Sequence, residues 1–473
     1  MYDTPSASAL PAITPAQVTT QLSTALLVLP PPVPAASGTV AVVPSSSKRG
    51  RGRPVELSET HLWLGVLWAV LEGLGGYRAL TRYLATLPLG RFAPVSISDS
   101  ALLQRLQRAG YEPLQALFDH LGVWLQATLS PPACTLASFA THIIALDETK
   151  LDAVTRRLPW QRQHKVGHPA LLAGKLAALF DIREQRWLRL HYLSESLRNC
   201  KQEALALVEE LPWHSLLLFD LGYFSFPWFD YLSERGFYWI SRYREKTCYQ
   251  LLHVYYRNGV ILDALVWLGS AHGPRAGRAV RLVRFGDGHD LRMYLTNVLD
   301  PLELPMGDIA RLYARRWDIE LAFLTLKELF GLHHWWSSQR PLILQQIAAV
   351  LLVAQVVQAL RLHLAAQADC DPFDVSLPLL VKHLPFLLRA RLHPVQWVLT
   401  YGTTQHFLRP SSRYSVVVPA IPADQLTPLP PDLILTRKAN YRLYKPRPPR
   451  PASNRKKKKK APASTSRSSR KAR

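Results

Sequence analysis

The sequence predicts an α/β protein with an extra helical domain and a basic segment at each end. Three observations lead to this fold class. Short apolar runs favour β-strands, and two of them end in an aspartate. A later helix carries charged side chains beside an apolar stripe, and the positive charge gathers at the two ends of the chain. With 473 residues, 48% of them hydrophobic, the chain can form two or three domains with real cores.

Residues 1–54 predict a disordered extension, because they are rich in Ala, Pro, Ser and Thr and contain a single acid, Asp3. The extension ends in Lys48-Arg-Gly-Arg-Gly-Arg-Pro54, which resembles an AT-hook. In such a motif Arg51 and Arg53 would enter a narrow A·T minor groove, where the negative potential is strong. A plain basic linker explains the same residues.

Residues 55–130 predict a helical domain. Apolar residues recur at helical spacing between His61 and Leu87, a Gly-Gly pair interrupts them, and Ser98 or Asp99 is suited to cap the next helix. Short helices joined by a glycine turn are compatible with a DNA-binding domain of the helix-turn-helix kind. A domain that only packs against the rest of the protein is the alternative.

The central part of the chain predicts strands, with one helix among them. Apolar runs bounded by turn residues favour strands at residues 142–147, 175–182, 187–192, 216–220 and 237–241. Residues 203–211 favour a helix, and residues 183–186 a turn. Further strand candidates lie at residues 249–256, 260–268, 280–285 and 291–295. We therefore expect a β-rich block at about 245–300, inside a central domain of residues 135–366.

The C-terminal part predicts more helices and then a basic tail. Residues 347–360 are the most apolar run, but it is too short to span a bilayer, so we expect a buried core helix. Residues 367–436 predict a helical region. Residues 437–473 carry sixteen Lys and Arg and no acid, and about +4 of the net charge of +23 is left for residues 55–436. Such a tail predicts disorder and attraction to nucleic acid, or a role in solubility alone.

One predicted helix carries four polar residues on a single face. An α-helix advances about 100° per residue, so four side chains share an arc of about 60°: Tyr313, Arg316, Glu320 and Lys327. An apolar stripe runs beside them. One carboxylate with two cations and a phenol suits a helix that holds a metal ion and grips phosphates beside it. A surface helix with an Arg316–Glu320 salt bridge is the simpler alternative.

Two aspartates, Asp147 and Asp220, each end a strand candidate. Sites in α/β sheets form at the carboxyl ends of strands, so we expect both to meet Glu320. Three carboxylates suit Mg²⁺ or Mn²⁺, and two such ions about 4 Å apart can promote an in-line phosphoryl displacement. Either aspartate could instead cap the turn that follows it. The spare acids that could replace one of them are Asp152, Asp181 and Asp230.

Together these motifs resemble the IS4-type DDE transposase family. The stretch Tyr313-Ala-Arg-Arg316-Trp-Asp-Ile-Glu320, followed by Lys327, is similar to the Tyr-Arg-Glu-Lys signature of that family. Its first and second acidic motifs look like Leu146-Asp147-Glu-Thr149 and Phe219-Asp220-Leu-Gly-Tyr223, and the stretch Tyr294-Leu-Thr-Asn297 is also typical. The resemblance covers roughly residues 60–365. One departure is Leu221, where many relatives carry Arg.

The resemblance implies an RNase H-like catalytic core with a β-rich insertion between the second aspartate and the glutamate. It implies a catalytic triad that binds two Mg²⁺ ions, with Mn²⁺ able to substitute: Asp147, Asp220 and Glu320. It also implies contacts to DNA phosphates near the cleaved end from Tyr313, Arg316 and Lys327. An Arg fork and a Lys charge are suited to phosphate oxygens.

The function that the resemblance implies is that of a transposase of a bacterial insertion sequence. It would bind terminal inverted repeats as a homodimer, cleave the transposon ends and join the 3′-OH to target DNA. Two alternatives remain open. One is a catalytically retired transposase that only binds DNA, and the other is a DDE-type nuclease without strand transfer.

The cysteines, histidines and tryptophans give weaker predictions. The cysteines are scattered without metal-ligand spacing, which argues against zinc and disulfides and fits a reducing compartment. With neither a signal peptide nor a membrane span expected, we predict a cytoplasmic, nucleoid-associated protein with no membrane partner. Adjacent His333 and His334 point to different sides of a helix, which disfavours a metal site. Trp335 and Trp336 could stack on an exposed base or pack in the core.

Overall fold

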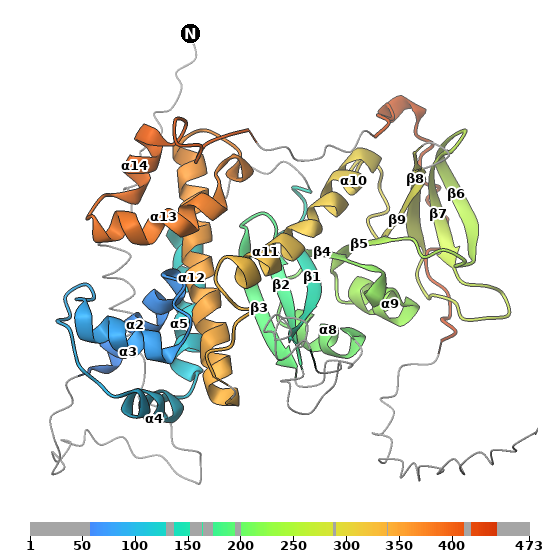
Figure 1. Ribbon diagram of the computed structural model, residues 1–473. Helices are drawn as coiled ribbons and strands as arrows, with labels where there is room; N and C mark the ends of the chain where they lie inside the picture. The colour runs from blue at the N-terminus through green and yellow to red at the C-terminus, as the bar shows by residue number, and fades with distance from the viewer. Residues whose placement is uncertain are drawn as a thin grey trace, which may run out of the picture.

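The computed structural model describes residues 57–128, 137–151, 163, 174–193, 200–286, 290–337, 339–410 and 418–441 (Figure 1). The AT-hook-like residues Arg51 and Arg53, the spare acid Asp152 and residues 442–473 lie outside the described residues. Within them the protein is a mixed α/β fold, with a large sheet and helices on both of its faces.

A nine-stranded mixed sheet runs through the molecule in the order β3-β2-β1-β4-β5-β9-β8-β7-β6. Its first five strands are β1 (Ile143–Lys150), β2 (Lys175–Asp181), β3 (Arg186–Leu193), β4 (Leu216–Phe219) and β5 (Tyr238–Arg242). Strand β1 is antiparallel to β2 and parallel to β4, and β4 is parallel to β5. The short apolar runs of the sequence thus form the centre of one sheet.

The strands of the expected β-rich block extend the same sheet. They are β6 (Tyr249–Asn258), β7 (Ile261–Leu268), β8 (Val280–Phe285) and β9 (Arg292–Thr296). Strand β9 pairs with β5 through Ile240 and Thr296, and the block continues outwards from there (Figure 1). This pairing satisfies the backbone groups along the edge of β5, which would otherwise be open.

Two helical layers cover the central strands. Alternate residues of a strand face opposite sides, so Ala145 packs in one core cluster and Leu146 in another. The cluster of Leu146 includes α8 (Cys200–Val208) and α9 (Phe226–Glu234). The cluster of Ala145 includes α10 (Met306–Arg315), α11 (Trp317–Glu328) and α12 (Arg340–Gln367).

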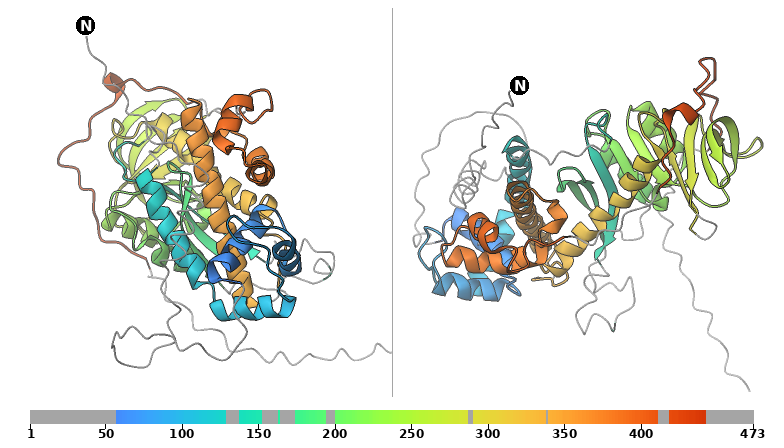
Figure 2. Two further views of the ribbon diagram at one scale, coloured as in Figure 1. Left: turned by 90° about the vertical axis from the view of Figure 1, so that its left-hand side faces the viewer. Right: turned by 90° about the horizontal axis from the view of Figure 1, so that it is seen from above.

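The remaining helices gather around α12 at one end of the molecule (Figure 2). They are α2 (Glu59–Leu71), α3 (Tyr77–Thr86), α4 (Asp99–Ala109), α5 (Glu112–Thr128), α13 (Leu377–Arg389) and α14 (Pro394–Tyr401). Ser98 caps α4, because its hydroxyl accepts from the backbone N–H of Ala101. Helix α12 is long and apolar enough to cross a membrane, but 83% of its most apolar window is buried inside the fold. It is therefore placed as a core helix.

The expectation of one helix from Tyr313 to Lys327 is wrong, because the chain forms two. Helix α10 ends at Arg315 and α11 begins at Trp317. Arg316 keeps helical backbone angles, but its N–H donates to the carbonyl of Tyr313, three residues back, at 3.1 Å. The break is thus a tightened turn, and both helices still face the same side of the sheet.

The expectation of a helical region up to residue 436 is wrong after residue 418. Residues 418–441 contain one short 3-10 turn and otherwise run along the β-rich block, where Ala279 N–H donates to Leu435 at 2.9 Å. Arg437, expected to begin the disordered tail, lies 4.5 Å above the ring of Trp267. The reason is apolar burial, because four leucines pack around Trp267 and its neighbours: Leu426, Leu429, Leu433 and Leu435.

Candidate active site

Three side chains form a row across neighbouring parallel strands. In the strand register, Leu146 of β1 lies beside Phe219 of β4, and Phe219 lies beside Ser241 of β5. The next residue on each path completes the row: Asp147, Asp220 and Arg242. The residues two places earlier pack in the core cluster of α10–α12, and side chains alternate along a strand. The row therefore faces α10 and α11.

The side chain of Asp147 is largely buried, with 19% of it exposed. Oδ1 accepts from the backbone N–H of Glu148 at 2.8 Å, while Oδ2 lies 3.6 Å from Nη1 of Arg316. The pKa of Asp147 is raised to about 6, chiefly by burial and also by the charges of Asp220 and Glu320, while the Glu148 N–H and Arg316 oppose the rise. Asp220 and Glu320 thus both lie within electrostatic reach of Asp147.

Asp220 and Glu320 each use one oxygen in a local contact. Asp220 Oδ1 accepts from the N–H of Gly222 at 2.8 Å, so the aspartate does cap the following turn, the alternative left open by the sequence. Glu320 Oε1 accepts from Nη2 of Arg316 at 2.7 Å. Within the described part of the chain, no donor reaches the second oxygen of either carboxylate. Each of the two carboxylates therefore keeps one oxygen that can bind a further ligand.

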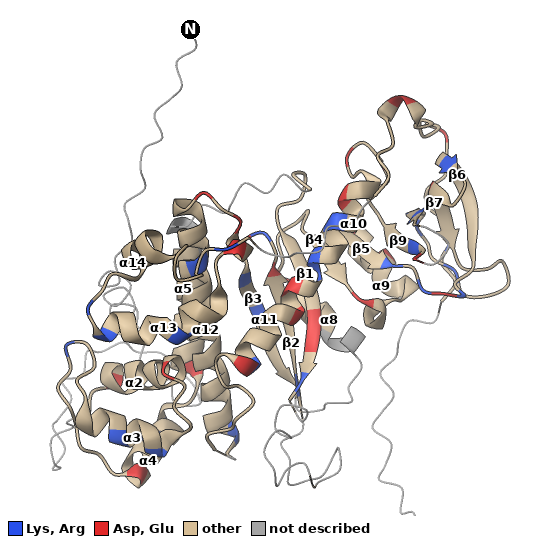
Figure 3. Ribbon diagram, turned by 45° about the horizontal axis from the view of Figure 1, so that its top comes forward, with Lys and Arg blue, Asp and Glu red and all other residues tan. Residues whose placement is uncertain are grey.

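Arg316 occupies the centre of the group. It is 7% exposed and bridges Asp147 and Glu320 (Figure 3 shows the acidic positions of β1 and α11). The guanidinium is paired with both acids, so the salt bridge that the sequence offered as the simpler alternative is present, and the contact to DNA stays a prediction. Its Nε is buried and has no hydrogen-bond partner among the described residues. The Nε–H donor of the guanidinium thus has no acceptor among the described residues.

Tyr313 and Lys327 reach the same strands from either side of Arg316. Tyr313 is buried and its hydroxyl donates to the carbonyl of Phe219 at 3.3 Å, next to Asp220; burial raises its pKa to about 12. Lys327 Nζ donates to Oγ1 of Thr149 at 2.5 Å. Of the predicted stripe, Arg316 contacts Asp147 and Glu320, whereas Tyr313 contacts the residue before Asp220 and Lys327 contacts the residue two places after Asp147.

The donor set fits hard cations. Three carboxylates supply oxygen ligands of the kind that Mg²⁺ and Mn²⁺ prefer. Their oxygens are not all within 4.8 Å of one another, a condition met among the described residues by a different group. Arg316 supplies positive charge in the space between Asp147 and Glu320.

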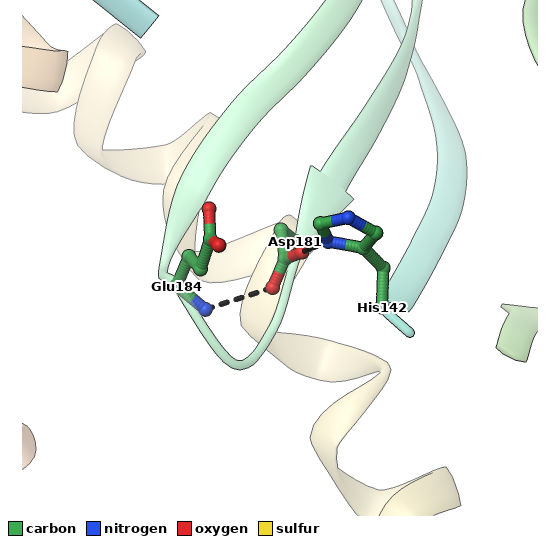
Figure 4. Close-up of side chains that lie close together, drawn as sticks. All are labelled: His142, Asp181 and Glu184. Atoms are coloured by element: carbon green, nitrogen blue, oxygen red, sulfur yellow. Dashed lines mark hydrogen bonds and ion pairs between the residues drawn. The ribbon is translucent and has the colours of Figure 1, made fainter. Parts of the chain in front are cut away.

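The tighter group lies at the opposite end of the strands (Figure 4). It consists of His142, Asp181 and Glu184. Asp181 accepts from Nδ1 of His142 at 2.7 Å and from the N–H of Glu184 at 2.7 Å, and the Asp181 hydrogen bond raises the pKa of His142. One Asp181 oxygen thus closes the turn between β2 and β3, and the other binds His142 just before β1. This spare acid does not join the row of Asp147.

The other residues singled out from the sequence take structural positions. Asp230 is buried and accepts from the N–H of Gly277 at 2.7 Å and from the hydroxyl of Tyr441 at 2.9 Å. Trp335 and Trp336 pack against the core. These contacts favour packing over stacking on a base.

Sequence reasoning missed three residues near the acids: Thr149, Arg242 and Arg244. Arg244 Nη2 donates to the carbonyl of Leu221 at 2.6 Å, beside Asp220. Arg242 could have been found from its place at the end of the strand predicted at 237–241. Thr149 could have been found because it lies two residues after Asp147, on the same face of β1.

Comparisons with known proteins find similar transposases. Residues 139–355 match a family model described as a transposase DDE domain. The transposase InsG of insertion sequence element IS4 from Escherichia coli (strain K12) is 26% identical over 295 residues, which cover 57% of this chain and 62% of that protein. The transposase of IS231C from Bacillus thuringiensis subsp. berliner is 25% identical over 296 residues, covering 50% and 60%.

The chain spans about 60% of the length of these two relatives. A cryo-EM structure of a piggyBac transposase synaptic complex with hairpin DNA aligns over 80% of this chain and 82% of that one, with a TM-score of 0.39 and 11% identity. The matched segment contains Asp147, Asp220, Glu320 and Arg316, together with helices α10 and α11. Residues 139–355 of this chain are thus similar to a transposase DDE domain, and the chain is similar to two insertion-sequence transposases, one of them that of IS4.

Proposed function

We propose that this protein is a DNA transposase of an insertion sequence and that Asp147, Asp220 and Glu320 are its catalytic residues. The observation that carries the proposal is the convergence of these carboxylates, from two neighbouring parallel strands and α11, inside a segment similar to a transposase DDE domain. We also propose an RNase H-like core. Its support is the strand order β3-β2-β1-β4-β5, antiparallel in its first half and parallel in its second.

The three acids would hold two Mg²⁺ ions, or Mn²⁺ in their place. Bound metal would supply the Lewis acid of an in-line phosphoryl displacement, with water or a 3′-OH as the attacking group. Asp147 has a pKa of about 6, so it is largely ionised at neutral pH and is a competent ligand. The repulsion it feels from Asp220 and Glu320 favours taking up cations.

Arg316 would change partners when DNA binds. Without substrate its guanidinium neutralises Asp147 and Glu320. Once cations take over that neutralisation, the fork can turn its donors, including the unpartnered Nε, to phosphate oxygens. Lys327 and the exposed Arg242 and Arg244 would extend the phosphate contacts along the strand ends. We assign Tyr313 to holding the end of β4 in place, because its hydroxyl is already bound to Phe219.

Other parts of the chain would bring the DNA to this site. Helices α3 and α4 expose three arginines, which suits the helical domain to recognising terminal inverted repeats: Arg78, Arg82 and Arg108. The basic segments at 48–53 and 442–473 would add affinity that falls with salt. We propose that the protein acts as a homodimer on two transposon ends, in the cytoplasm at the nucleoid.

Cleavage of DNA taken from the two flanks of the gene tests this proposal. The wild type is expected to nick at the boundary of a terminal inverted repeat with Mg²⁺ and to join the 3′-OH to a target plasmid. Glu320→Gln should lower nicking by at least about 100-fold. Glu328→Gln, the same change on the exposed side of α11, should leave it unaltered.

Other outcomes identify the alternatives. Specific binding with no cleavage indicates a retired transposase. Cleavage without joining indicates a nuclease. Equal nicking by wild type and Glu320→Gln refutes the assignment of the triad.

A further inference from the structure

A group of hydrogen bonds joins the break between α10 and α11 to the turn between β2 and β3. Asp318 is buried and follows Arg316 by two residues. Its Oδ2 accepts from Nε of Arg315 and from Nε2 of Gln185, in that turn, at 3.0 Å each. The same two side chains donate to the carbonyl of Ile182, Arg315 at 3.1 Å and Gln185 at 2.8 Å. These four residues therefore close a ring, which we call the clamp.

The clamp acts on a segment that has little packing of its own. Tyr313 of α10 is buried, and so is Ile319 of α11. Between them Ala314 and Trp317 are exposed. Packing thus fixes each helix on its own side of the break, and the clamp ties the residues that flank Arg316 to the sheet.

We propose that Asp318 is a positioning residue, which clamps the helix break onto the β2–β3 turn and so places Arg316 between Asp147 and Glu320. The proposal rests on the proposed function, in which Arg316 neutralises these acids and then meets phosphate. Arg316 lies 3.6 Å from Asp147 and 2.7 Å from Glu320. A guanidinium recognises oxygens by direction as well as by charge, so the place of its backbone matters.

The clamp does not use the guanidinium that it positions. Arg316 can therefore turn from the acids to phosphate while its backbone stays in place. Asp318 and Glu320 both lie in the first turn of α11, but their surroundings differ. The side chain of Asp318 is 1% exposed and that of Glu320 is 35% exposed. This difference suits Asp318 to a positioning role and Glu320 to binding metal.

Four variants separate the clamp from the rest of the fold. Asp318→Ala removes the acceptor, whereas Asp318→Asn keeps an oxygen that can accept from both donors. Gln185→Met breaks the same ring from the turn and keeps a side chain of similar shape, so it decides the result if Asp318→Ala does not fold. A matched control is Asp308→Asn, because Asp308 forms the same kind of i, i+3 pair with the exposed Arg311, at 2.8 Å.

The first experiment measures the placement of Arg316 without metal, DNA or activity. Phenylglyoxal labels the folded protein, and mass spectrometry compares the labelling rate of Arg316, which is 7% exposed, with that of the exposed Arg391. Asp318→Ala and Gln185→Met are expected to raise this ratio about fivefold, because hydrogen bonds that hold the break are lost. Asp318→Asn and Asp308→Asn should stay close to the wild type.

The fully buried Arg281 reports global opening in the same samples, and its labelling should not change. No increase at Arg316 in the folded variants Asp318→Ala and Gln185→Met overturns the proposal, even if the protein proves not to be a transposase. An equal rise at Arg316 and Arg281 would show that Asp318 only stabilises the fold, and this result overturns the proposal as well.

The second experiment measures the consequence for cleavage. Asp318→Ala is expected to lower kcat about tenfold with an unchanged KM for DNA, because Arg316 keeps its charge but is no longer held at the site. Asp318→Asn should lose less, and Asp308→Asn should cleave like the wild type. The double variant of Asp318→Ala with Arg316→Gln should be no slower than Arg316→Gln alone, because Asp318 acts through Arg316.

Each cleavage outcome has a distinct meaning. Multiplied losses in the double variant would show that Asp318 acts apart from Arg316 and would overturn the positioning role. Full activity of Asp318→Ala, where Arg316→Gln is impaired, would overturn it too. Wild-type cleavage by Arg316→Gln removes the role of Arg316 in the proposed function, while the labelling experiment still decides what places this residue.

Discussion

The most direct energetic prediction concerns the cost of ionising Asp147. Its pKa of about 6 stands above the ordinary 3.8, chiefly because of burial. Each pH unit of such a difference corresponds to about 1.36 kcal/mol. Above pH 6 the folded protein therefore carries a cost of about 3 kcal/mol for holding this charge, which the unfolded chain does not bear. Asp147→Asn removes the charge while its amide oxygen can still accept from Glu148.

The sign of the pH dependence follows from the two pKa values. The cost is fully present above the folded pKa of about 6, shrinks as pH falls towards 3.8, and is absent below it. Asp147→Asn should thus be more stable than wild type by up to about 3 kcal/mol at pH 8 and by about half of that at pH 5. Urea unfolding in EDTA, followed at both pH values, measures the difference.

A control variant and the effect of added Mg²⁺ complete this test. Asp432→Asn, an exposed aspartate on the 418–441 segment, should not stabilise the protein. Added Mg²⁺ should stabilise the wild type and not Asp147→Asn, and its effect should weaken as pH falls through about 6, because protonated Asp147 is no longer a ligand. An Asp147→Asn variant that is destabilised at pH 8, or whose advantage grows towards pH 5, would refute this reasoning.

Three further predictions follow from named contacts. Arg316→Gln should raise the pKa of Asp147 further, so that Mg²⁺ stabilisation fades at a higher pH than in wild type; an unchanged midpoint would deny the Arg316–Asp147 interaction. Removal of residues 442–473 should flatten the salt dependence of DNA binding without lowering the melting temperature, because the described packing contacts up to residue 441 are all kept; an unchanged slope would exclude the tail from phosphate. Arg281→Met should cost about 3–5 kcal/mol in urea unfolding by stranding buried Asp263, and the double change with Asp263→Leu should recover most of it; additive losses would contradict a paired role.

The strands of the site were predictable because their sequence signal is local. Buried strands read as short apolar runs, and Asp220 directly follows β4 as expected. The expectation that Asp147 ends its strand is wrong, because pairing with β2 continues β1 to Lys150. The spacing of the Tyr313–Lys327 stripe was enough to place those side chains on one side of the chain. It did not reveal the break at Arg316, because helical spacing survives a single tightened turn.

The remaining features depend on contacts between distant parts of the chain. Thr149 becomes informative only once α11 lies over β1, and Arg242 only once β5 lies beside β4. Residues 418–441 carry prolines and a few leucines, a pattern with no helical or strand period, so their path along the β-rich block could not be predicted. The Arg316–Glu320 pair follows from a spacing of four residues, whereas the Arg316–Asp147 contact depends on α11 lying over β1.

The central claim is that metal ions bind between Asp147, Asp220 and Glu320. Fe²⁺ bound in place of Mg²⁺ generates hydroxyl radicals that cut the backbone near the metal, and mass spectrometry locates the cuts without any need for DNA or activity. The account predicts cuts close to residues 147, 220 and 320, suppressed by excess Mg²⁺ and lost in Glu320→Gln. Cuts centred on His142, Asp181 and Glu184 at the opposite end of the strands would contradict it.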